Sequence, residues 1–237
     1  MNKTIGILGG MGPEATVYFY DLIIKKTHAA SDQEHIPTII YSDPRIPPRT
    51  DAILENGPSP VPFLLEGAKM LILAGADFLV MPCITAHYFL FDISSTLEIP
   101  FIHLIEEAAA WTKTKIQNVE KVGLIASTGT LNSKLFQDIF DREGIAILTP
   151  SPDDQMTVME CIFGSRGIKA GFKAGESRDK IVGIANKIIE RGAEAVIAGC
   201  TEIPLVLKPE DIPAPLIEPM DISAEACIKT AGYRLKG

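Results

Sequence analysis

Two cysteines of this chain have similar surroundings, each lying just after a short run of apolar residues. Cys83 is followed by Thr85, and Cys200 is followed by Thr201. A cysteine at the exit of a strand and the entrance of a helix lies near backbone N–H groups and the positive end of the helix dipole, which lower a thiol pKa. Each cysteine is therefore a candidate nucleophile or base. The remaining two, Cys161 and Cys227, fall inside helix patterns and are interpreted as buried apolar side chains.

Two such cysteines suit a reaction that moves a proton from one face of a carbon atom to the other. One sulfur accepts a proton as a thiolate while the other donates a proton as a thiol, and the roles exchange in the reverse direction. Removing the α-proton of an amino acid also creates negative charge on the substrate. Backbone N–H groups and the hydroxyls of Thr85 and Thr201 would stabilise that charge. These residue types indicate two-base proton transfer that needs no cofactor.

The two cysteines also occupy equivalent places in an internal repeat. At an offset of 117 residues, Gly6 aligns with Gly123 and Cys83 aligns with Cys200. A Gly-Ala-acid triplet begins eight residues before each cysteine. The repeat predicts two similar lobes, each with its cysteine just past the carboxyl end of a buried strand, where open α/β sheets bind ligands. The active-site cleft is expected between the lobes.

Short apolar runs alternate with longer amphipathic stretches along the chain. This alternation predicts an α/β fold in which each lobe is a parallel sheet flanked by helices, because right-handed crossovers place helices on both faces. The expected strands are residues 4–8, 38–41, 78–81, 101–105, 121–126, 146–149, 195–198 and 215–217. Helix patterns include residues 13–28, 61–73, 132–142, 177–191 and 222–235. The first lobe is expected to comprise residues 1–104 and 212–237, and the second lobe residues 105–211.

The composition argues against several classes of protein. The chain has 237 residues, of which 46% are hydrophobic, a length and composition that fit one large or two small globular domains. A net charge of −8 with scattered basic residues argues against nucleic-acid binding. The uncharged stretch 78–91 is too short for a membrane helix, and no secretory pattern is present. Without a C-x-x-C motif, reduced thiols and a cytoplasmic location are expected.

Five motifs stand in order along nearly the whole chain: Gly9–Thr16, Arg45–Thr50, Met81–His87, Gly167–Gly171 and Gly199–Pro204. Together they resemble the aspartate/glutamate racemase family, whose members work without pyridoxal phosphate and are built from two Rossmann-like lobes. The resemblance implies racemisation of an acidic amino acid, aspartate or alternatively glutamate. It implies neither a cofactor nor a metal, a small amino-acid substrate as the partner, and a homodimer.

The resemblance also assigns roles to individual residues. Cys83 and Cys200 would be the two acid/base residues. Arg49 and Lys169 match the basic positions that aspartate-specific members use for the side-chain carboxylate, and Arg can grip a carboxylate with two hydrogen bonds. Met11 and Gly12 would line the cleft, and the α-carboxylate and amino group would be held by Thr85 and Thr201.

One position departs from the family pattern, which usually has Asn directly after the first cysteine. This chain has Ile84, which can neither donate a hydrogen bond to a substrate nor accept one. An alternative is therefore a homologue that binds an acidic amino acid but turns it over weakly. A cysteine-based isomerase or decarboxylase of small dicarboxylates is a second alternative, since it would use the same lobes.

Two further interpretations depend on residues near these motifs. Residues 10–15 fit the G-x-G-x-x-A fingerprint of a dinucleotide site, but the next acidic residue at a strand end, Asp43, comes 31 residues after Gly12 rather than about 20. His87 follows Cys83 by four residues. Because nothing nearby completes a metal site, His87 is interpreted as a structural or positioning residue. Glu202 is interpreted as a residue that orients a neighbour or caps a helix.

Overall fold

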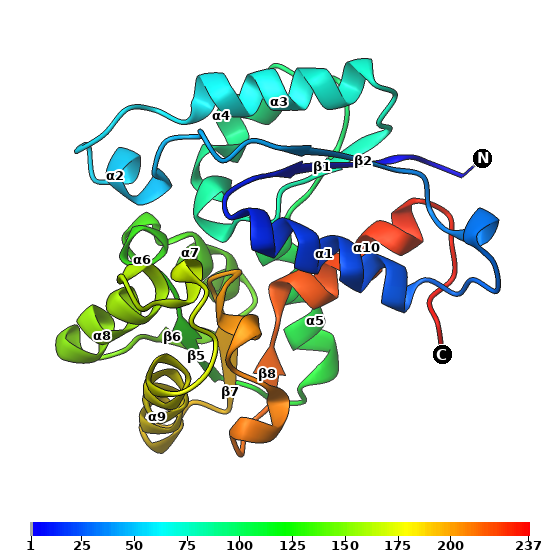
Figure 1. Cartoon of the computed structure of the whole chain (residues 1–237). Helices are drawn as coiled ribbons and strands as arrows, with labels where there is room; N and C mark the ends of the chain where they lie inside the picture. Colours follow the sequence, from blue (N-terminus) through cyan, green and yellow to red (C-terminus); the bar gives the residue numbers. More distant parts are fainter. Residues whose placement is uncertain (1) are drawn as a thin grey trace. The chain divides into compact units, whose positions relative to one another are not determined.

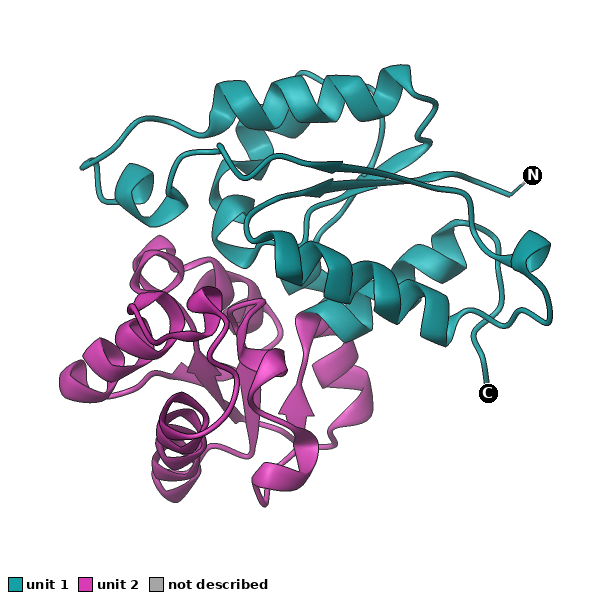
Figure 2. Cartoon of the chain, in the orientation of Figure 1, with its two compact units in different colours: residues 1–107, 220–237 teal, residues 108–219 magenta. Residues whose placement is uncertain are grey.

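The computed structural model describes residues 2–237 and contains two compact units, coloured separately in Figure 2. Unit 1 extends to Glu107 and resumes at Met220, and unit 2 comprises Ala108–Pro219. The chain therefore changes unit within the helix α5 (Leu104–Lys115) and again at the start of α10 (Pro219–Thr230).

Unit 1 contains a parallel sheet with the strand order β2-β1-β3-β4. Its strands are β1 (Ile5–Gly9), β2 (Thr38–Ser42), β3 (Phe78–Val80) and β4 (Phe101–Ile102). Figure 1 shows helices α3 and α1 on opposite sides of β1 and β2. In addition to α10 and the start of α5, the helical segments are α1 (Pro13–Lys26), η1 (Asp32–Glu34), α2 (Arg49–Ile53), α3 (Val61–Leu73), η2 (Ile84–Phe89) and α4 (Leu90–Ser94), where η denotes a 3-10 helix.

Unit 2 contains a second parallel sheet with the corresponding strand order, β6-β5-β7-β8. Its strands are β5 (Lys121–Ile125), β6 (Ala146–Leu148), β7 (Ala195–Ala198) and β8 (Leu216–Ile217). Its helical segments are α6 (Thr128–Ser133), α7 (Leu135–Arg142), α8 (Pro152–Phe163), η3 (Ile168–Ala170), α9 (Glu176–Glu190), η4 (Ile203–Leu205) and η5 (Pro209–Asp211), with the rest of α5. The prediction of two similar lobes with parallel sheets is confirmed.

All eight predicted strands form, and three of the four central ones are buried along their whole length. Every residue of β1, β3 and β7 is buried, as expected where helices cover both faces of a parallel sheet. The helix predicted over 132–142 is two helices, because Lys134 adopts a left-handed conformation between α6 and α7.

The C-terminal segment is shared between the units. The sequence pattern predicts that residues 212–237 belong to the first lobe, but β8 pairs with β7 and so extends the sheet of unit 2. The following helix α10 and residues 231–237 belong to unit 1. Lys26 of α1 forms ion pairs with Asp221 and Glu225 of α10 at 2.7 and 2.8 Å, and Leu235 forms a β-bridge with Thr27. The sequence of a strand as short as β8 does not indicate which strand it pairs with, so its assignment to the first lobe is wrong.

The repeat seen in the sequence is also a repeat of packing. Gly6 in β1 leaves room for its neighbours, since a Cβ there would lie 2.5 Å from Leu79 Cδ2 and 2.8 Å from Ala76 Cβ. At the equivalent position in β5, a Cβ on Gly123 would overlap Ile188 Cγ2 of α9. Each first strand therefore carries glycine because neighbouring side chains approach it closely, from β3 and the loop before it in unit 1 and from α9 in unit 2.

The acidic residue of the repeated triplet also has the same role in both units. Asp77 accepts a hydrogen bond from the backbone N–H of Thr4 at 2.7 Å. Glu194 accepts hydrogen bonds from the backbone N–H groups of Glu120 and Lys121 at 2.7 and 2.9 Å. Both carboxylates thus fix the backbone at the beginning of the first strand of their sheet, so their role is structural.

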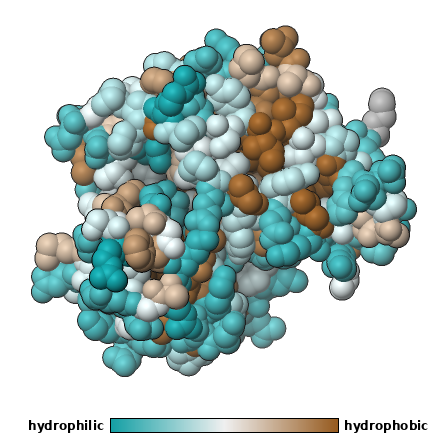
Figure 3. Space-filling view, in the orientation of Figure 1, coloured by the Kyte–Doolittle hydropathy of each residue, from teal (hydrophilic) through white to brown (hydrophobic). Residues whose placement is uncertain are grey.

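The surface of unit 1 exposes several large apolar side chains, and most apolar atoms on the face in Figure 3 lie over this unit. Leu73 and Phe91 are the most exposed of them, at 83% and 80%. Within residues 2–237, no helix combines the length and the apolar character that crossing a membrane requires.

Candidate active site

Cys83 lies directly beyond the carboxyl end of β3, the position that the sequence analysis expected. Its side chain is buried, with 4% of the residue exposed, and its thiol is not in a disulfide. The Cys83 N–H donates to the carbonyl of Met81 at 2.7 Å, and the Cys83 carbonyl accepts from the N–H of Ala86 at 3.2 Å. The strand therefore ends in a tight turn that leads into η2 with both backbone groups of Cys83 bonded.

Cys200 holds the equivalent place in unit 2, beyond the end of β7. The preceding residue, Gly199, donates its N–H to Ile125 of β5 at 2.8 Å, and a Cβ at Gly199 would overlap Leu124. Cys200 is buried, with 7% exposed, and carries a free thiol. Glycine is required here because the turn runs directly against β5.

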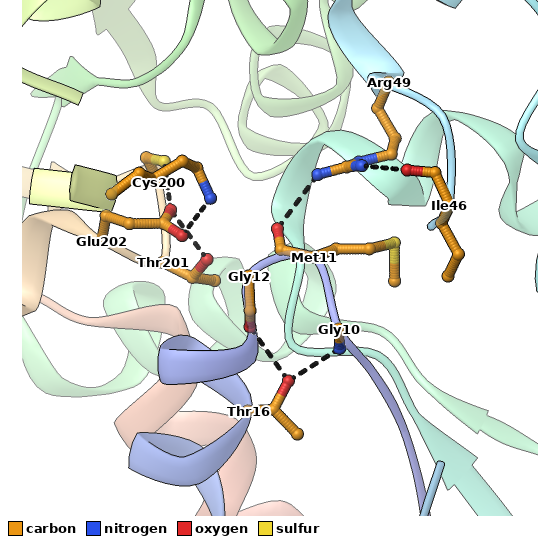
Figure 4. A network of polar contacts seen from close by, with 10 residues as sticks. Gly10, Met11, Gly12, Thr16, Ile46, Arg49, Cys200, Thr201 and Glu202 are labelled. Atoms are coloured by element: carbon orange, nitrogen blue, oxygen red, sulfur yellow. Dashed lines mark hydrogen bonds and ion pairs between the residues drawn. The ribbon is translucent and has the colours of Figure 1, made fainter. Parts of the chain in front are cut away.

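The Cys200 thiol is part of a polar network around one buried carboxylate, shown in Figure 4. Cys200 Sγ donates to Glu202 Oε2 at 3.0 Å, and the hydroxyl of Thr201 donates to the same oxygen at 3.2 Å. The other oxygen, Glu202 Oε1, forms an ion pair with the ammonium group of Lys169. Lys169 also lies 5.6 Å from the centre of the Phe163 ring.

Burial and this network together determine the protonation of Cys200. Burial raises the pKa of the Cys200 thiol well above its usual range, the negative charge of Glu202 raises it further, and Lys169 opposes both effects. The expectation that the strand-to-helix turn lowers the thiol pKa is therefore wrong for Cys200. The reason is that burial and the Glu202 carboxylate outweigh any effect of η4, which is a single 3-10 turn.

Arg49, at the start of α2, presents a positive charge that no carboxylate of residues 2–237 neutralises in an ion pair. Its guanidinium donates to the carbonyls of Ile46, Pro47 and Met11 at 3.2, 3.0 and 3.1 Å, as Figure 4 shows in part. Its Nε is buried and has no hydrogen-bond partner within that part of the chain. A charge held in this way favours a bound anion.

The turn after β1 holds two further predicted residues, Met11 and Gly12. The hydroxyl of Thr16 accepts a hydrogen bond from the N–H of Gly10 at 2.9 Å and donates to the carbonyl of Gly12 at 3.0 Å. Since Arg49 bonds the Met11 carbonyl, the structure brings Met11, Gly12 and Arg49 together within unit 1.

The comparisons with known proteins identify the family. The family model of Asp/Glu/hydantoin racemases matches residues 8–227. The chain belongs to this family. Among solved structures, an aspartate racemase from Picrophilus torridus is 31% identical with a TM-score of 0.87, and the match covers 99% of this chain and 96% of that one. A putative Asp/Glu racemase from Yersinia pestis is 26% identical with a TM-score of 0.81, over 97% and 99% of the two chains.

A curated relative agrees with this assignment. The broad specificity amino-acid racemase RacX of Bacillus subtilis is 27% identical over 234 residues, covering 95% of this chain and 97% of the relative. Membership of the racemase family therefore indicates an amino-acid racemase, an isomerase that acts on small amino-acid substrates.

Within this racemase, Glu202 is more central than the sequence analysis expected. It contacts Cys200, Thr201 and Lys169, whereas it was interpreted only as an orienting or capping residue. The repeat contains a signal that could have identified it, because Glu202 aligns with Thr85 at the offset of 117 residues. Thr85 lies half-buried in η2, two residues after Cys83.

The remaining sequence interpretations concern a dinucleotide and a metal. Asp43, the acidic residue after β2, is held by Arg45 through two side-chain hydrogen bonds of 2.9 Å each. That carboxylate is therefore already bound within the protein instead of being presented to a ribose. Among residues 2–237, no group of three or more His, Cys, Asp or Glu side chains is arranged to hold a metal ion.

Proposed function

We propose that this protein racemises an acidic amino acid, with aspartate as the first candidate and glutamate as the second, without a cofactor. In this proposal Cys83 and Cys200 exchange protons with Cα. The observation that carries the proposal is the repeated placement of two buried, free thiols, each directly after the strand next to the glycine-bearing strand of its sheet. The homodimer remains a prediction from the family resemblance, and the cytoplasmic location remains a prediction from the sequence pattern and the cysteine usage.

The surroundings of Cys200 indicate which cysteine starts as the acid and which as the base. Because its pKa is raised, Cys200 starts as a thiol and acts as the acid, so Cys83 acts as the base in that direction. The Cα–H bond breaks as an S–H bond forms at Cys83, and the S–H bond of Cys200 breaks as Cα gains a proton on its opposite face. Cys83 then carries the proton and Cys200 is the thiolate, which is the starting state for the reverse reaction.

The substrate class follows from the charges. Arg49 has no carboxylate partner among residues 2–237 and is proposed to bind the side-chain carboxylate. Lys169 is proposed to assist it, because an ammonium group has three N–H donors and can contact Glu202 and a substrate carboxylate together. Thr85 and Thr201 are proposed to hold the α-carboxylate and amino group, beside the backbone of Met11 and Gly12.

The deciding experiment incubates L-aspartate with the protein in D₂O without pyridoxal phosphate. We expect loss of the α-proton signal by NMR and appearance of D-aspartate by chiral separation. Cys83→Ala and Cys200→Ala should each abolish racemisation, because two-base transfer needs both sulfurs. Cys161→Ala and Cys227→Ala serve as controls, since these buried thiols lie in α8 and α10, and should retain it.

Other outcomes would replace the proposal. Full racemisation by both Cys83→Ala and Cys200→Ala would exclude the two-base mechanism. Formation of an alkene or CO₂ from a dicarboxylate would favour the isomerase or decarboxylase. Binding of aspartate without proton exchange would favour a protein in which Ile84 has removed turnover. Protection from thermal unfolding by NAD would favour an oxidoreductase.

A further inference from the structure

His87 connects the backbone of Cys83 to the beginning of α5. The imidazole is buried in η2, four residues after Cys83, and its Nδ1 lies 2.9 Å from the Cys83 carbonyl oxygen. Its Nε2 lies 3.2 Å from the backbone nitrogen of Leu104, the first residue of α5. The ring therefore joins the backbone of Cys83 to that of Leu104, which lies 17 residues after His87.

These two contacts define the tautomer of His87. The backbone N–H of Leu104 can only donate, so Nε2 must accept and carries no hydrogen. Nδ1 then carries the hydrogen and donates it to the Cys83 carbonyl. Burial, together with the ring of His103 at 4.8 Å, lowers the pKa of His87 to about 3. The imidazole is therefore neutral near neutral pH, and its role is to hold hydrogen bonds.

The contact with Cys83 restrains the group that carries the sulfur. The Cys83 N–H is bonded to Met81, and its carbonyl receives hydrogen bonds from both Ala86 and His87. Fixing the flanking peptide groups fixes the direction of the Cα–Cβ bond, so that each staggered rotamer of Cys83 places Sγ at a defined position. Catalysis depends strongly on such placement, because reacting atoms must be held in near-attack geometry.

We propose that His87 is the positioning residue for Cys83, and that its Nδ1–H bond to the Cys83 carbonyl sets the placement of the sulfur. The bond from Leu104 to Nε2 has a different task, which is to hold the ring and the first turn of α5. The inference rests on the function proposed above, in which Cys83 is one of the two acid/base residues.

The test separates the two hydrogen bonds with two variants. In His87→Asn the amide nitrogen can occupy the place of Nδ1, so the bond to Cys83 is kept and the bond from Leu104 is lost. In His87→Gln the longer side chain can accept from Leu104 but places its amide at the position of Nε2, so the bond to Cys83 is lost. The exposed His28 provides a control, His28→Asn.

We expect His87→Gln to lower kcat about tenfold to a hundredfold with little change in KM, and His87→Asn to stay within about threefold of the parent. Peptide-resolved alkylation with iodoacetamide, followed against pH, should show a changed profile at Cys83 in the Gln variant only. Urea unfolding of both variants reports the structural cost separately. Equal losses of kcat in both variants, or losses that follow stability alone, would overturn the inference.

Failure of the positioning role of His87 and failure of the proposed function give different results in these experiments. If Cys83→Ala racemises aspartate at the parent rate, the proposed function fails. The alkylation profile of Cys83 still compares His87→Gln with His87→Asn, since it needs no turnover. An unchanged Cys83 profile in the Gln variant would then overturn the positioning role by itself.

Discussion

The Cys200 thiol keeps its proton because of its neighbours in space. Glu202 places a carboxylate oxygen 3.0 Å from the sulfur, and Lys169, which comes 33 residues before Glu202, holds the other oxygen. Ionising the thiol would set two negative charges side by side in a buried region, which costs free energy. The two cysteines of the repeat are thus equivalent in position but have different partners, since Cys83 has Ile84 and Thr85 where Cys200 has Thr201 and Glu202.

Replacing Glu202 by Gln tests this account. Gln can still accept a hydrogen bond from the thiol but carries no charge, so we expect the pKa of Cys200 to fall toward its usual range. At a fixed mildly alkaline pH, Cys200 should then be alkylated faster by iodoacetamide than in the parent. Peptide-resolved mass spectrometry of alkylation against pH measures this. Glu190→Gln, an exposed change at the end of α9, should leave the profile unchanged. An unaltered Cys200 profile in Glu202→Gln would show that burial alone sets the pKa.

At the scale of elements, the first strand of each sheet has one position, Gly6 in β1 and Gly123 in β5, where the neighbouring atoms leave no room for a side chain. Gly6 faces Leu79 and Ala76, and Gly123 faces Ile188. Leu79 lies in β3 and Ala76 in the loop before it, whereas Ile188 lies in α9. These contacts therefore join each first strand to the segments that form or precede the cysteine-bearing strand. The close packing at these two glycines is therefore part of what places the two cysteines.

Gly6→Ala and Gly123→Ala should each destabilise the protein by about 1–3 kcal/mol, because an added methyl overfills a packed core. Gly183 in α9 is a matched control, since a Cβ there would meet no atom within 4 Å. Gly183→Ala should be neutral or stabilise by up to about 1 kcal/mol through helix propensity. Urea unfolding at equilibrium measures all three. A Gly6→Ala variant as stable as Gly183→Ala would contradict the packing argument.

At the scale of the whole molecule, several carboxylates have pKa values below their usual range in the folded state. A side-chain hydrogen bond from Arg45 lowers the pKa of Asp43, and one from Lys187 lowers that of Asp154. Backbone N–H groups lower the pKa of Glu194. A group whose folded pKa is depressed adds stability above its unfolded pKa, and that stability is lost as the pH falls through the folded pKa.

We therefore expect the free energy of unfolding to decline as the pH falls below the ordinary values of 3.8 for Asp and 4.5 for Glu. Glu194→Gln should weaken this dependence, because a neutral amide does not titrate in either state. Urea unfolding between about pH 7 and about pH 3 measures the slope. Glu190→Gln is again the control. A Glu194→Gln variant with the same slope as the parent would show that Glu194 does not contribute.

Much of the fold could be predicted because its signals are local. The buried strand over 78–80 and the alternation of strands and helices follow from hydrophobic periodicity, and the repeat follows from Gly6, Gly123 and the two cysteines. Features without a clear signal in the local sequence were missed or misassigned. The break at Lys134 and the pairing of β8 with β7 are examples, since neither leaves a distinct pattern in a short segment.

The sequence by itself determined the fold class, the two-lobed repeat and the family, because hydrophobic period, glycine placement and motif order are carried by neighbouring residues. The tertiary structure alone decided that Cys200 shares Glu202 with Lys169, and that His87 donates to Cys83 while accepting from Leu104. The physical reason is that protonation and tautomer depend on burial and on charges within a few ångströms. Folding brings those groups together from separate parts of the chain.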